Sequence, residues 1–182
     1  TLTVDFFSEW NMVGLPLIVE NSQPVSLFPD ALEGTLYSFS DGYIQEDELS
    51  VGNGYWLRFS QSGMIQITGE PVNEFAISLN TDWNLISGIS YLVSITSISD
   101  PQNLIVPGTI YGFEEMYVNV DELIPGKGYW LRSTGEGEIM LSISGQTTTR
   151  MIAEQKPVGA NTIVFGNQTL YFGMEVQEEN KL

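Results

Sequence analysis

A seven-residue motif occurs twice in this chain. Gly-x-Gly-Tyr-Trp-Leu-Arg spans residues 52–58 and returns at residues 126–132. The segments around the motif, residues 35–60 and 109–134, align without a gap and are identical at 13 of 26 positions. Because each copy repeats the side chains that specify its local fold, the repeat predicts two copies of one small module in tandem.

The repeated glycines and tryptophans point to structural roles. Two glycines precede each Tyr-Trp pair, so we expect a tight turn in which at least one glycine has a positive φ angle. The turns should match in backbone, with Asn53 and Lys127 pointing to solvent. The Trp-Asn pair of residues 10–11 returns at residues 83–84, and both tryptophans are expected in the core. The residues assigned a structural role are Trp10, Gly52, Gly54, Trp83, Gly126 and Gly128.

Alternation of apolar and polar residues with period two dominates the chain. It is clear at residues 2–6, 64–68 and 75–79, and it is typical of half-buried β-strands. The best candidates for helices are two short segments, residues 24–32 and 99–104. The chain is therefore predicted to be all-β, with two tandem copies of a small β-sandwich or barrel-like module plus a C-terminal β-hairpin.

Domain boundaries are expected where the repeat begins and ends. Residues 1–72 form the first predicted module and residues 73–145 the second, and so short a connection should make them pack together or exchange an edge strand. Residues 146–173 hold two apolar runs around Gly166-Asn167, which predict a hairpin packed on the modules. The polar residues 174–182 are expected to be a tail or the start of a linker.

The strongly acidic composition excludes several classes of partner. Lys and Arg number 6 and Asp and Glu number 23, which gives a formal net charge of −17. Such a surface repels phosphates, so we expect no nucleic-acid partner. No apolar run reaches the roughly 18 residues that would indicate a spanning helix, so no membrane insertion is expected. The chain begins at Thr1, and we expect it to be a processed piece of a longer protein.

The residue types needed for common catalytic sites are missing. The chain has no cysteine and no histidine, which removes disulfides, the usual zinc sites, cysteine nucleophiles and histidine-based triads. We therefore expect no enzyme activity and no cofactor.

Acidic clusters leave one alternative for a metal. Asp47-Glu48-Leu49 and Asp121-Glu122-Leu123 match between the copies, and further carboxylates lie nearby. Clustered carboxylates can bind calcium, but this spacing fits no EF-hand loop. Solvated surface charge is the favoured interpretation, with calcium as the alternative.

The Tyr-Trp strand allows two interpretations. On a strand, Tyr55 and Leu57 face one side, while Trp56 and Arg58 face the other. In the favoured interpretation, Trp56 and Trp130 are buried in the core and the neighbouring arginines cover their rings. In the other, their exposed faces stack on sugar rings. The candidate ligand-binding residues are then Tyr55, Trp56, Arg58, Tyr129, Trp130 and Arg132.

The second copy resembles a known module. Trp-Asn-Leu-Ile-Ser at residues 83–87, Tyr-Gly-Phe at 111–113 and Leu-Ile-Pro-Gly-Lys-Gly-Tyr-Trp-Leu at 123–131 resemble the motif of accessory domains in large secreted or cell-surface bacterial proteins that are cargo of type IX secretion. The resemblance covers about residues 1–145, although the first copy lacks the proline before its Gly-x-Gly turn. It implies an extracellular or cell-surface location and the role of an accessory domain.

These observations predict a non-catalytic extracellular accessory or interaction module of a larger secreted bacterial protein, with a structural or adhesive role. Its expected partners are other protein domains or cell-surface proteins. Two alternatives remain. One is a carbohydrate-binding module that uses Trp56 and Trp130 as stacking platforms for glycans. The other is a fragment of a glycoside hydrolase, which would need two carboxylates across a cleft.

Overall fold

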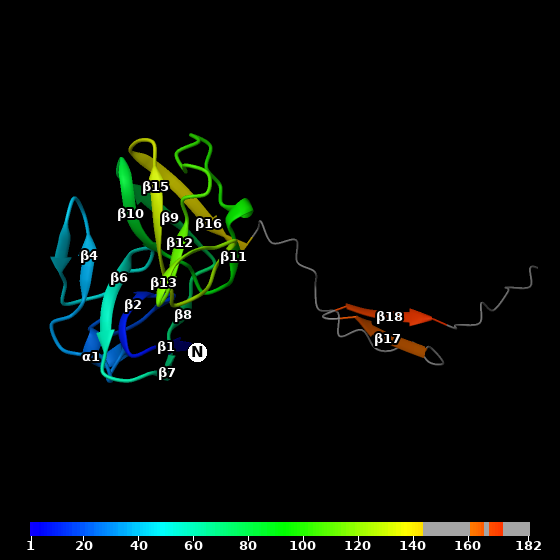
Figure 1. Ribbon diagram of the computed structural model, residues 1–182, viewed down its shortest axis with the longest axis horizontal. Coiled ribbons are helices and arrows are strands. Elements are labelled where there is room, and N and C mark those ends of the chain that lie inside the picture. The colour runs from blue at the N-terminus through cyan, green and yellow to red at the C-terminus, as the bar shows by residue number, and fades with distance from the viewer. Residues whose placement is uncertain (144–160, 166–167, 173–182) are drawn as a thin grey trace, which may run out of the picture. The chain divides into compact units, whose positions relative to one another are not determined.

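The protein is all-β. A computed structural model describes residues 1–143, 161–165 and 168–172, and the chain divides into two compact units, Thr1–Gln146 and Thr147–Leu182. The helical segments that the structure describes are one turn of α-helix, α1 (Pro24–Leu27), and one 3₁₀ turn, η1 (Ile95–Ser97) (Figure 1). In the described residues, neither is long or apolar enough to cross a membrane.

The first repeat segment forms short antiparallel strands. They are β1 (Leu2–Phe6), β2 (Glu9–Gly14), β3 (Leu17–Ile18), β4 (Tyr37–Phe39), β5 (Tyr43–Gln45), β6 (Gly54–Phe59), β7 (Gly63–Ile67) and β8 (Glu70–Pro71). A four-stranded sheet has the order β2-β6-β4-β5, and two further pairs are β1–β7 and β3–β8. The Gly-x-Gly-Tyr-Trp-Leu-Arg motif therefore supplies a central strand of the largest sheet.

The second repeat segment has an equivalent sheet. Its strands are β9 (Glu74–Leu79), β10 (Asp82–Ser87), β11 (Val93–Ser94), β12 (Tyr111–Glu114), β13 (Met116–Asn119), β14 (Glu122–Leu123), β15 (Gly128–Ser133) and β16 (Gly137–Ser142). The sheet order is β10-β15-β12-β13, and β9 pairs with β16 as β1 pairs with β7. The registers also match, because Trp10 lies opposite Arg58 and Trp83 lies opposite Arg132.

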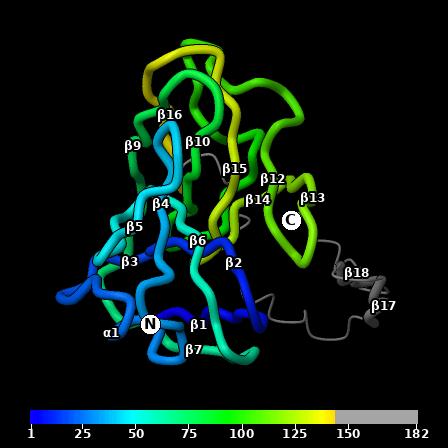
Figure 2. The backbone as a smooth tube through the Cα atoms, turned by 60° about the vertical axis from the view of Figure 1, so that its left-hand side comes forward, coloured from blue at the N-terminus to red at the C-terminus, as the bar shows by residue number. Residues whose placement is uncertain are grey.

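The two repeat segments share one compact unit. Figure 2 shows them as adjoining groups of strands, the first coloured blue to cyan and the second green to yellow. Reciprocal backbone hydrogen bonds join them: Gly14 N donates to Gly126 O over 3.0 Å, and Ser87 N donates to Gly52 O over 2.9 Å. Both repeat segments therefore lie in the same compact unit, Thr1–Gln146.

Each Tyr-Trp strand separates two apolar layers, as its alternation predicts. Tyr55, Leu57 and Phe59 lie in one buried core with the side chains of β1 and β2. Tyr129 and Leu131 lie in a second core with residues of β9 and β16. The tryptophans of both strands point the other way, into a third cluster where the two large sheets meet.

The glycine turns confirm the φ prediction. Gly52 has a φ of 86° and Gly126 a φ of 83°. In both turns the residue after this glycine donates its backbone N–H three residues back, at 3.3 Å from Asn53 to Ser50 and at 3.2 Å from Lys127 to Ile124. A positive φ at the third position of such a turn is the type II geometry, which glycine adopts without strain.

The predicted exposure of the residues between the glycines is half right. Asn53 is exposed, but Lys127 is half-buried. Its Nζ donates to the Asp5 backbone oxygen over 2.6 Å and to Asp5 Oδ2 over 3.0 Å. Lys127 also lies over the Phe7 ring, 5.9 Å from its centroid. Contact with β1, which the sequence pattern could not show, draws this side chain out of solvent.

The acidic segments that follow β4 and β12 form strands: β5 folds back on β4, and β13 folds back on β12, because Asp41 and Glu115 adopt positive φ angles and close tight hairpins.

One prediction about local structure is wrong. Residues 99–104 are not helical. Asp100 instead accepts the backbone N–H groups of Leu104 and Ile105, each over 2.9 Å, which satisfies this turn through its side chain.

The predicted C-terminal hairpin forms. β17 (Asn161–Phe165) pairs with β18 (Gln168–Phe172), with Phe165 opposite Gln168. The type of the turn at Gly166-Asn167 and the predicted tail at residues 174–182 lie outside the described residues. Packing of the hairpin on the modules stays a prediction.

A buried tyrosine hydroxyl supports each glycine turn. Tyr55 accepts the backbone N–H of Ser50 over 2.9 Å, and Tyr129 accepts that of Ile124 over 2.7 Å. Burial raises the pKa of Tyr129 to about 12; the hydrogen bond from Ile124 opposes this rise and the charge of Glu114 adds to it. The native protein therefore holds this proton more tightly than the unfolded chain does.

We expect the free energy of unfolding to fall by about 2–3 kcal/mol between pH 10 and pH 12 because of Tyr129. The stabilisation is complete below the unfolded pKa of about 10 and is lost as the pH rises through the folded pKa. Urea unfolding across this range measures the effect, and Tyr129→Phe should remove that part of the pH dependence. An unchanged alkaline slope in Tyr129→Phe would show that other groups cause it.

Candidate functional site

Trp56 and Trp130 are buried where the two large sheets meet. They are 8% and 9% exposed, which agrees with the core interpretation of both residues. The cluster around them also contains Met12, Leu85, Tyr37, Phe39, Tyr111 and Phe113. Trp56 therefore belongs to a seam between the repeat segments rather than to the core of its own segment.

Each of these tryptophans contacts a phenylalanine from the other repeat segment. The Trp56 and Phe113 ring centroids lie 4.9 Å apart with planes at 74°, and those of Trp130 and Phe39 lie 4.9 Å apart at 83°. Edge-to-face contacts of this kind stabilise beyond simple burial, by about 0.5–1.5 kcal/mol each. The seam is thus built reciprocally, with Phe39 and Phe113 as equivalent residues.

Trp10 and Trp83 are not in the core, so that prediction is wrong. They are 39% and 38% exposed. Trp10 lies on β2, which is the outer strand of its sheet, and Trp83 lies on the equivalent strand β10. Each makes an edge-to-face contact with the buried tryptophan of its own segment. The ring centroids of Trp10 and Trp56 lie 6.4 Å apart, and those of Trp83 and Trp130 lie 6.3 Å apart. No further strand follows them in the sheet, so each indole keeps an open side.

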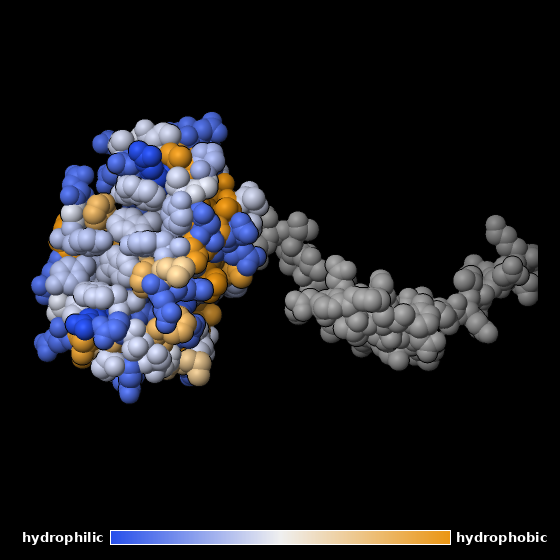
Figure 3. All heavy atoms as spheres, viewed as in Figure 1, coloured by the Kyte–Doolittle hydropathy of each residue, from blue (hydrophilic) through white to orange (hydrophobic). Residues whose placement is uncertain are grey.

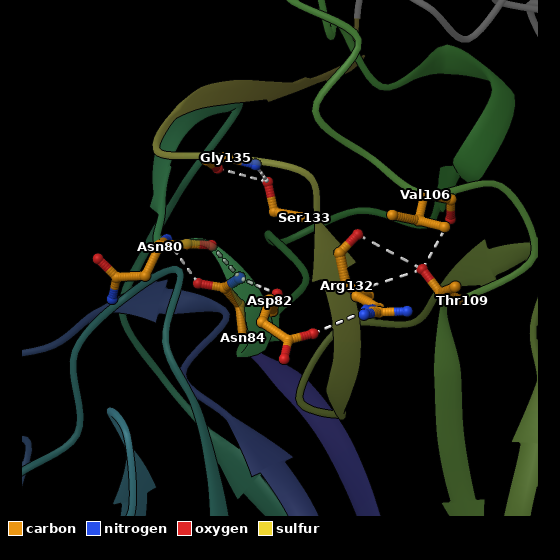
Figure 4. Close-up of polar contacts among 8 residues, drawn as sticks. All are labelled: Asn80, Asp82, Asn84, Val106, Thr109, Arg132, Ser133 and Gly135. Atoms are coloured by element: carbon orange, nitrogen blue, oxygen red, sulfur yellow. Dashed lines mark hydrogen bonds and ion pairs between the residues drawn. The ribbon is translucent and has the colours of Figure 1, made fainter.

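The asparagine of each Trp-Asn pair has a role that the sequence did not reveal. Asn84 is buried; its Oδ1 accepts the Asn80 N–H over 2.8 Å, and its Nδ2 donates to the Asn80 and Asp82 carbonyls (Figure 4). Asn11 makes the same three contacts around Phe7 and Glu9. These amides fix the turns between β1 and β2 and between β9 and β10, which place Trp10 and Trp83, as side chain to backbone bonds commonly do.

The arginines do not cover the tryptophans as expected. Arg58 pairs with Glu9 at 2.6 Å, and Arg132 pairs with Asp82 at 2.6 Å (Figure 4). The two carboxylates belong to the first residues of β2 and β10, which have positive φ angles of 71° and 76° and come directly before the Trp-Asn pairs. The turn geometry brings each carboxylate within reach of the guanidinium. These exposed pairs add little stability, but they neutralise the arginines beside Trp10 and Trp83.

Two pockets of about 460 Å³ each open at the aromatic seam. Trp10, Tyr37, Tyr43, Trp56 and Phe113 line the first. Phe39, Tyr43, Trp83, Tyr111, Tyr117 and Trp130 line the second. Under the sequence repeat, every wall residue of the first pocket has its equivalent in the second, and each pocket takes rings from both segments.

Two tyrosines on hairpin tips form the outer walls. Tyr43 is 60% exposed and Tyr117 is 53% exposed. Burial raises the pKa of Tyr43, and the nearby Tyr117 adds to the rise. The Trp56 indole N–H lies near enough to the Tyr43 hydroxyl to oppose this rise, although Trp56 Nε1 makes no hydrogen bond of ordinary geometry. Among the described residues, this buried indole N–H at the first pocket has no hydrogen-bond partner of ordinary geometry.

The six candidate ligand-binding residues lie in three different environments. Trp56 and Trp130 line the pockets. Tyr55 and Tyr129 are buried in the cores behind the sheets, and the arginines form the exposed ion pairs beside Trp10 and Trp83. Further pocket walls come from β4, β5, β12 and β13, whose aromatic side chains were not among the predicted site residues. Their signal was available, because Tyr37, Phe39 and Tyr43 are identical in type to Tyr111, Phe113 and Tyr117.

The clustered carboxylates of the first acidic segment lie outside the two aromatic pockets. A third pocket of about 450 Å³, beside α1, has Glu33, Glu46 and Asp47 among its lining residues, and Glu46 accepts a hydrogen bond from Ser38 over 2.7 Å. Within the described residues, no group of three or more acidic side chains is arranged to hold a metal ion. Neither aromatic pocket has a carboxylate among its lining residues.

No protein-family model, curated protein or solved structure matches this chain.

Proposed function

We propose that this protein is a non-catalytic recognition module that serves as an accessory part of a larger extracellular or cell-surface protein. The observation that carries the proposal is the pair of equivalent aromatic pockets at the seam. Concave, aromatic-lined surface that stays open is typical of sites that bind another molecule. An internal duplication would explain why two such sites are built from matching residues.

The extracellular location rests on sequence. The Trp-Asn-Leu-Ile-Ser and Pro-Gly-Lys-Gly-Tyr-Trp motifs resemble those of accessory domains in secreted bacterial proteins. Partners of this kind of domain are other protein domains or surface structures, and an acidic surface keeps the module soluble among them. A structural or adhesive role follows from the same argument.

The geometry supports the two alternatives less well. Trp56 and Trp130 have neighbouring rings against them, so neither presents the flat open face that sugar stacking requires; Trp10 and Trp83 have the more exposed faces. The walls also offer few hydrogen-bonding groups for sugar hydroxyls. For a glycoside hydrolase, the carboxylate pair would have to lie outside the aromatic pockets.

Indole signals test the proposed recognition role. In the ¹⁵N-labelled full chain, the four tryptophan N–H signals report on both pockets, and the probes are soluble polysaccharides, apolar peptides and small organic compounds. We expect at least one probe class to shift the Trp10 and Trp83 signals saturably, with loss in Trp10→Ala and Trp83→Ala. Tyr91→Ala, an exposed aromatic outside both pockets, is the matched control.

If every probe leaves all four indole signals unmoved at millimolar concentration, the seam serves packing alone and the recognition role fails. If a polysaccharide alone shifts Trp10 and Trp83, the carbohydrate-binding alternative replaces the favoured partner class while the recognition role stands.

A further inference from the structure

We infer that the two aromatic pockets are cages for alkylated ammonium groups, such as a trimethylammonium group. This inference rests on the proposed recognition function, because it names the chemistry that the pockets bind. A cation over the face of a tryptophan, tyrosine or phenylalanine ring is attracted by the ring quadrupole when it lies within about 6 Å of the centroid. Both pockets are lined by these three residue types alone.

The rings are arranged around a space rather than stacked on each other. Around the first pocket, Trp10 and Trp56 meet at 86°, and Trp56 and Phe113 meet at 74°. Around the second, Trp83 and Trp130 meet at 82°. None of these pairs is stacked face to face, so the aromatic walls of each pocket meet at steep angles. An alkylated ammonium group, which carries its charge over a rounded apolar surface, matches such walls.

The negative charge of the protein favours a cation over a neutral apolar group as the ligand of the pockets. The chain carries a formal charge of −17, and a surface field of that sign concentrates cations near it. Three carboxylates, those of Asp41, Glu114 and Glu115, lie on or beside the hairpin tips that carry Tyr43 and Tyr117. All three are exposed, so they attract a cation without filling the pockets.

In the described part of the chain, the two arginines beside the pocket tryptophans do not oppose the binding of a cation. Arg58 lies opposite Trp10 in the sheet, and Arg132 lies opposite Trp83. Each arginine has its own carboxylate partner at 2.6 Å. The carboxylates therefore offset the charge of the arginines, so the arginines do not repel a second cation from the neighbouring tryptophan rings.

Figure 3 shows a pale area of intermediate hydropathy on one face of the first unit, with blue hydrophilic side chains along much of its margin. Volumes of about 460 Å³ fall within the range of small-molecule pockets. Two cages should therefore accept two ammonium groups per chain.

The test compares choline with its neutral carbon isostere, 3,3-dimethylbutan-1-ol, in titrations of the full chain followed by tryptophan fluorescence and indole NMR. Size and shape are matched, so a difference reports the charge. We expect choline to bind about ten-fold more tightly than the alcohol, with two sites per chain. Added sodium chloride should weaken choline binding and leave the alcohol unchanged, because salt screens the acidic field.

Variants assign the sites. Trp10→Ala should remove one choline site, Trp83→Ala the other, and the double variant both, while Tyr91→Ala should keep two. Circular dichroism checks that each variant is folded; Trp10→Leu and Trp83→Leu, which keep an apolar side chain but no aromatic ring, serve if an alanine variant is not. A peptide that contains trimethyllysine is then compared with the same peptide containing unmodified lysine. This comparison distinguishes a protein side chain from a free ammonium compound as the source of the bound group.

Equal binding of choline and the alcohol would overturn the cation inference and leave a recognition site for apolar groups. Choline binding that survives the Trp10→Ala and Trp83→Ala double variant would also overturn it, because the group would lie elsewhere. Absence of choline binding, together with a shift from any other probe class at Trp10 or Trp83, would overturn the ammonium inference alone. The recognition role itself fails only if no probe of any class reaches these indoles.

Discussion

Trp56→Ala is expected to lower the free energy of unfolding by about 3–5 kcal/mol, the range for removing a large buried aromatic side chain. The Trp56 ring contacts Phe113 from the other repeat segment and Trp10 from its own, so its loss opens a cavity where the two sheets meet. Trp130→Ala should have an effect of the same size, because Phe39 packs on Trp130 in the equivalent way.

Urea unfolding of the full chain measures this effect, and the same cluster supplies a matched control. Trp10→Ala removes the same residue type from a position with an open side, and we expect a smaller loss of about 1–2 kcal/mol. If Trp56→Ala does not fold, Trp56→Phe should still show a measurable loss. A loss below about 1 kcal/mol for a folded Trp56→Ala would show that the seam carries little of the packing energy.

The strand faces were predictable from sequence because they depend on a local property. Side chains alternate with period two along any strand, so Tyr55 and Leu57 had to share a face that Trp56 does not. The positive φ angles at Gly52 and Gly126 were predictable for a similar reason, since a tight turn before two bulky residues strongly favours glycine at one position. Neither inference needed to know which strands are neighbours.

The exposure of Trp10 and Trp83 depends on information that the local pattern lacks. Both positions have the alternation of half-buried strand residues, yet their strands are the outer members of the sheets. The same limit applies to the arginines. Glu9 and Asp82 pair with Arg58 and Arg132 only because their positive φ angles at the starts of β2 and β10 bring the carboxylates into reach.

The sequence identifies the equivalent aromatic residues of the two pockets, but not how they combine. The repeat marks the equivalent rings, such as Tyr43 and Tyr117, because matched aromatic types at matched positions are unexpected for solvent-facing loops. What the repeat cannot show is that Phe39 completes the pocket of the second segment while Phe113 completes that of the first. That exchange follows from the way the two sheets face each other, which is a property of the assembled unit.

Gly126→Ala is expected to lower the free energy of unfolding by about 2–5 kcal/mol, from two causes that add. An L-residue at this positive φ of 83° is strained by about 1–2 kcal/mol. Its Cβ would also lie 2.5 Å from Val4 Cγ2 and 2.9 Å from Val4 Cγ1, and overpacking of this kind costs about 1–3 kcal/mol. The second cause exists only because the turn of one repeat segment is pressed against β1 of the other.

Gly108→Ala separates the two causes. Gly108 has a similar φ of 73° but no atom within 4 Å of the added Cβ, so only the strain of about 1–2 kcal/mol is expected. Combining Gly126→Ala with Val4→Ala should be less damaging than the sum of the single changes, because the shortened side chain makes room for the new methyl group. Equal losses in Gly126→Ala and Gly108→Ala, with strict additivity to Val4→Ala, would show that the two repeat segments do not approach each other closely at this turn.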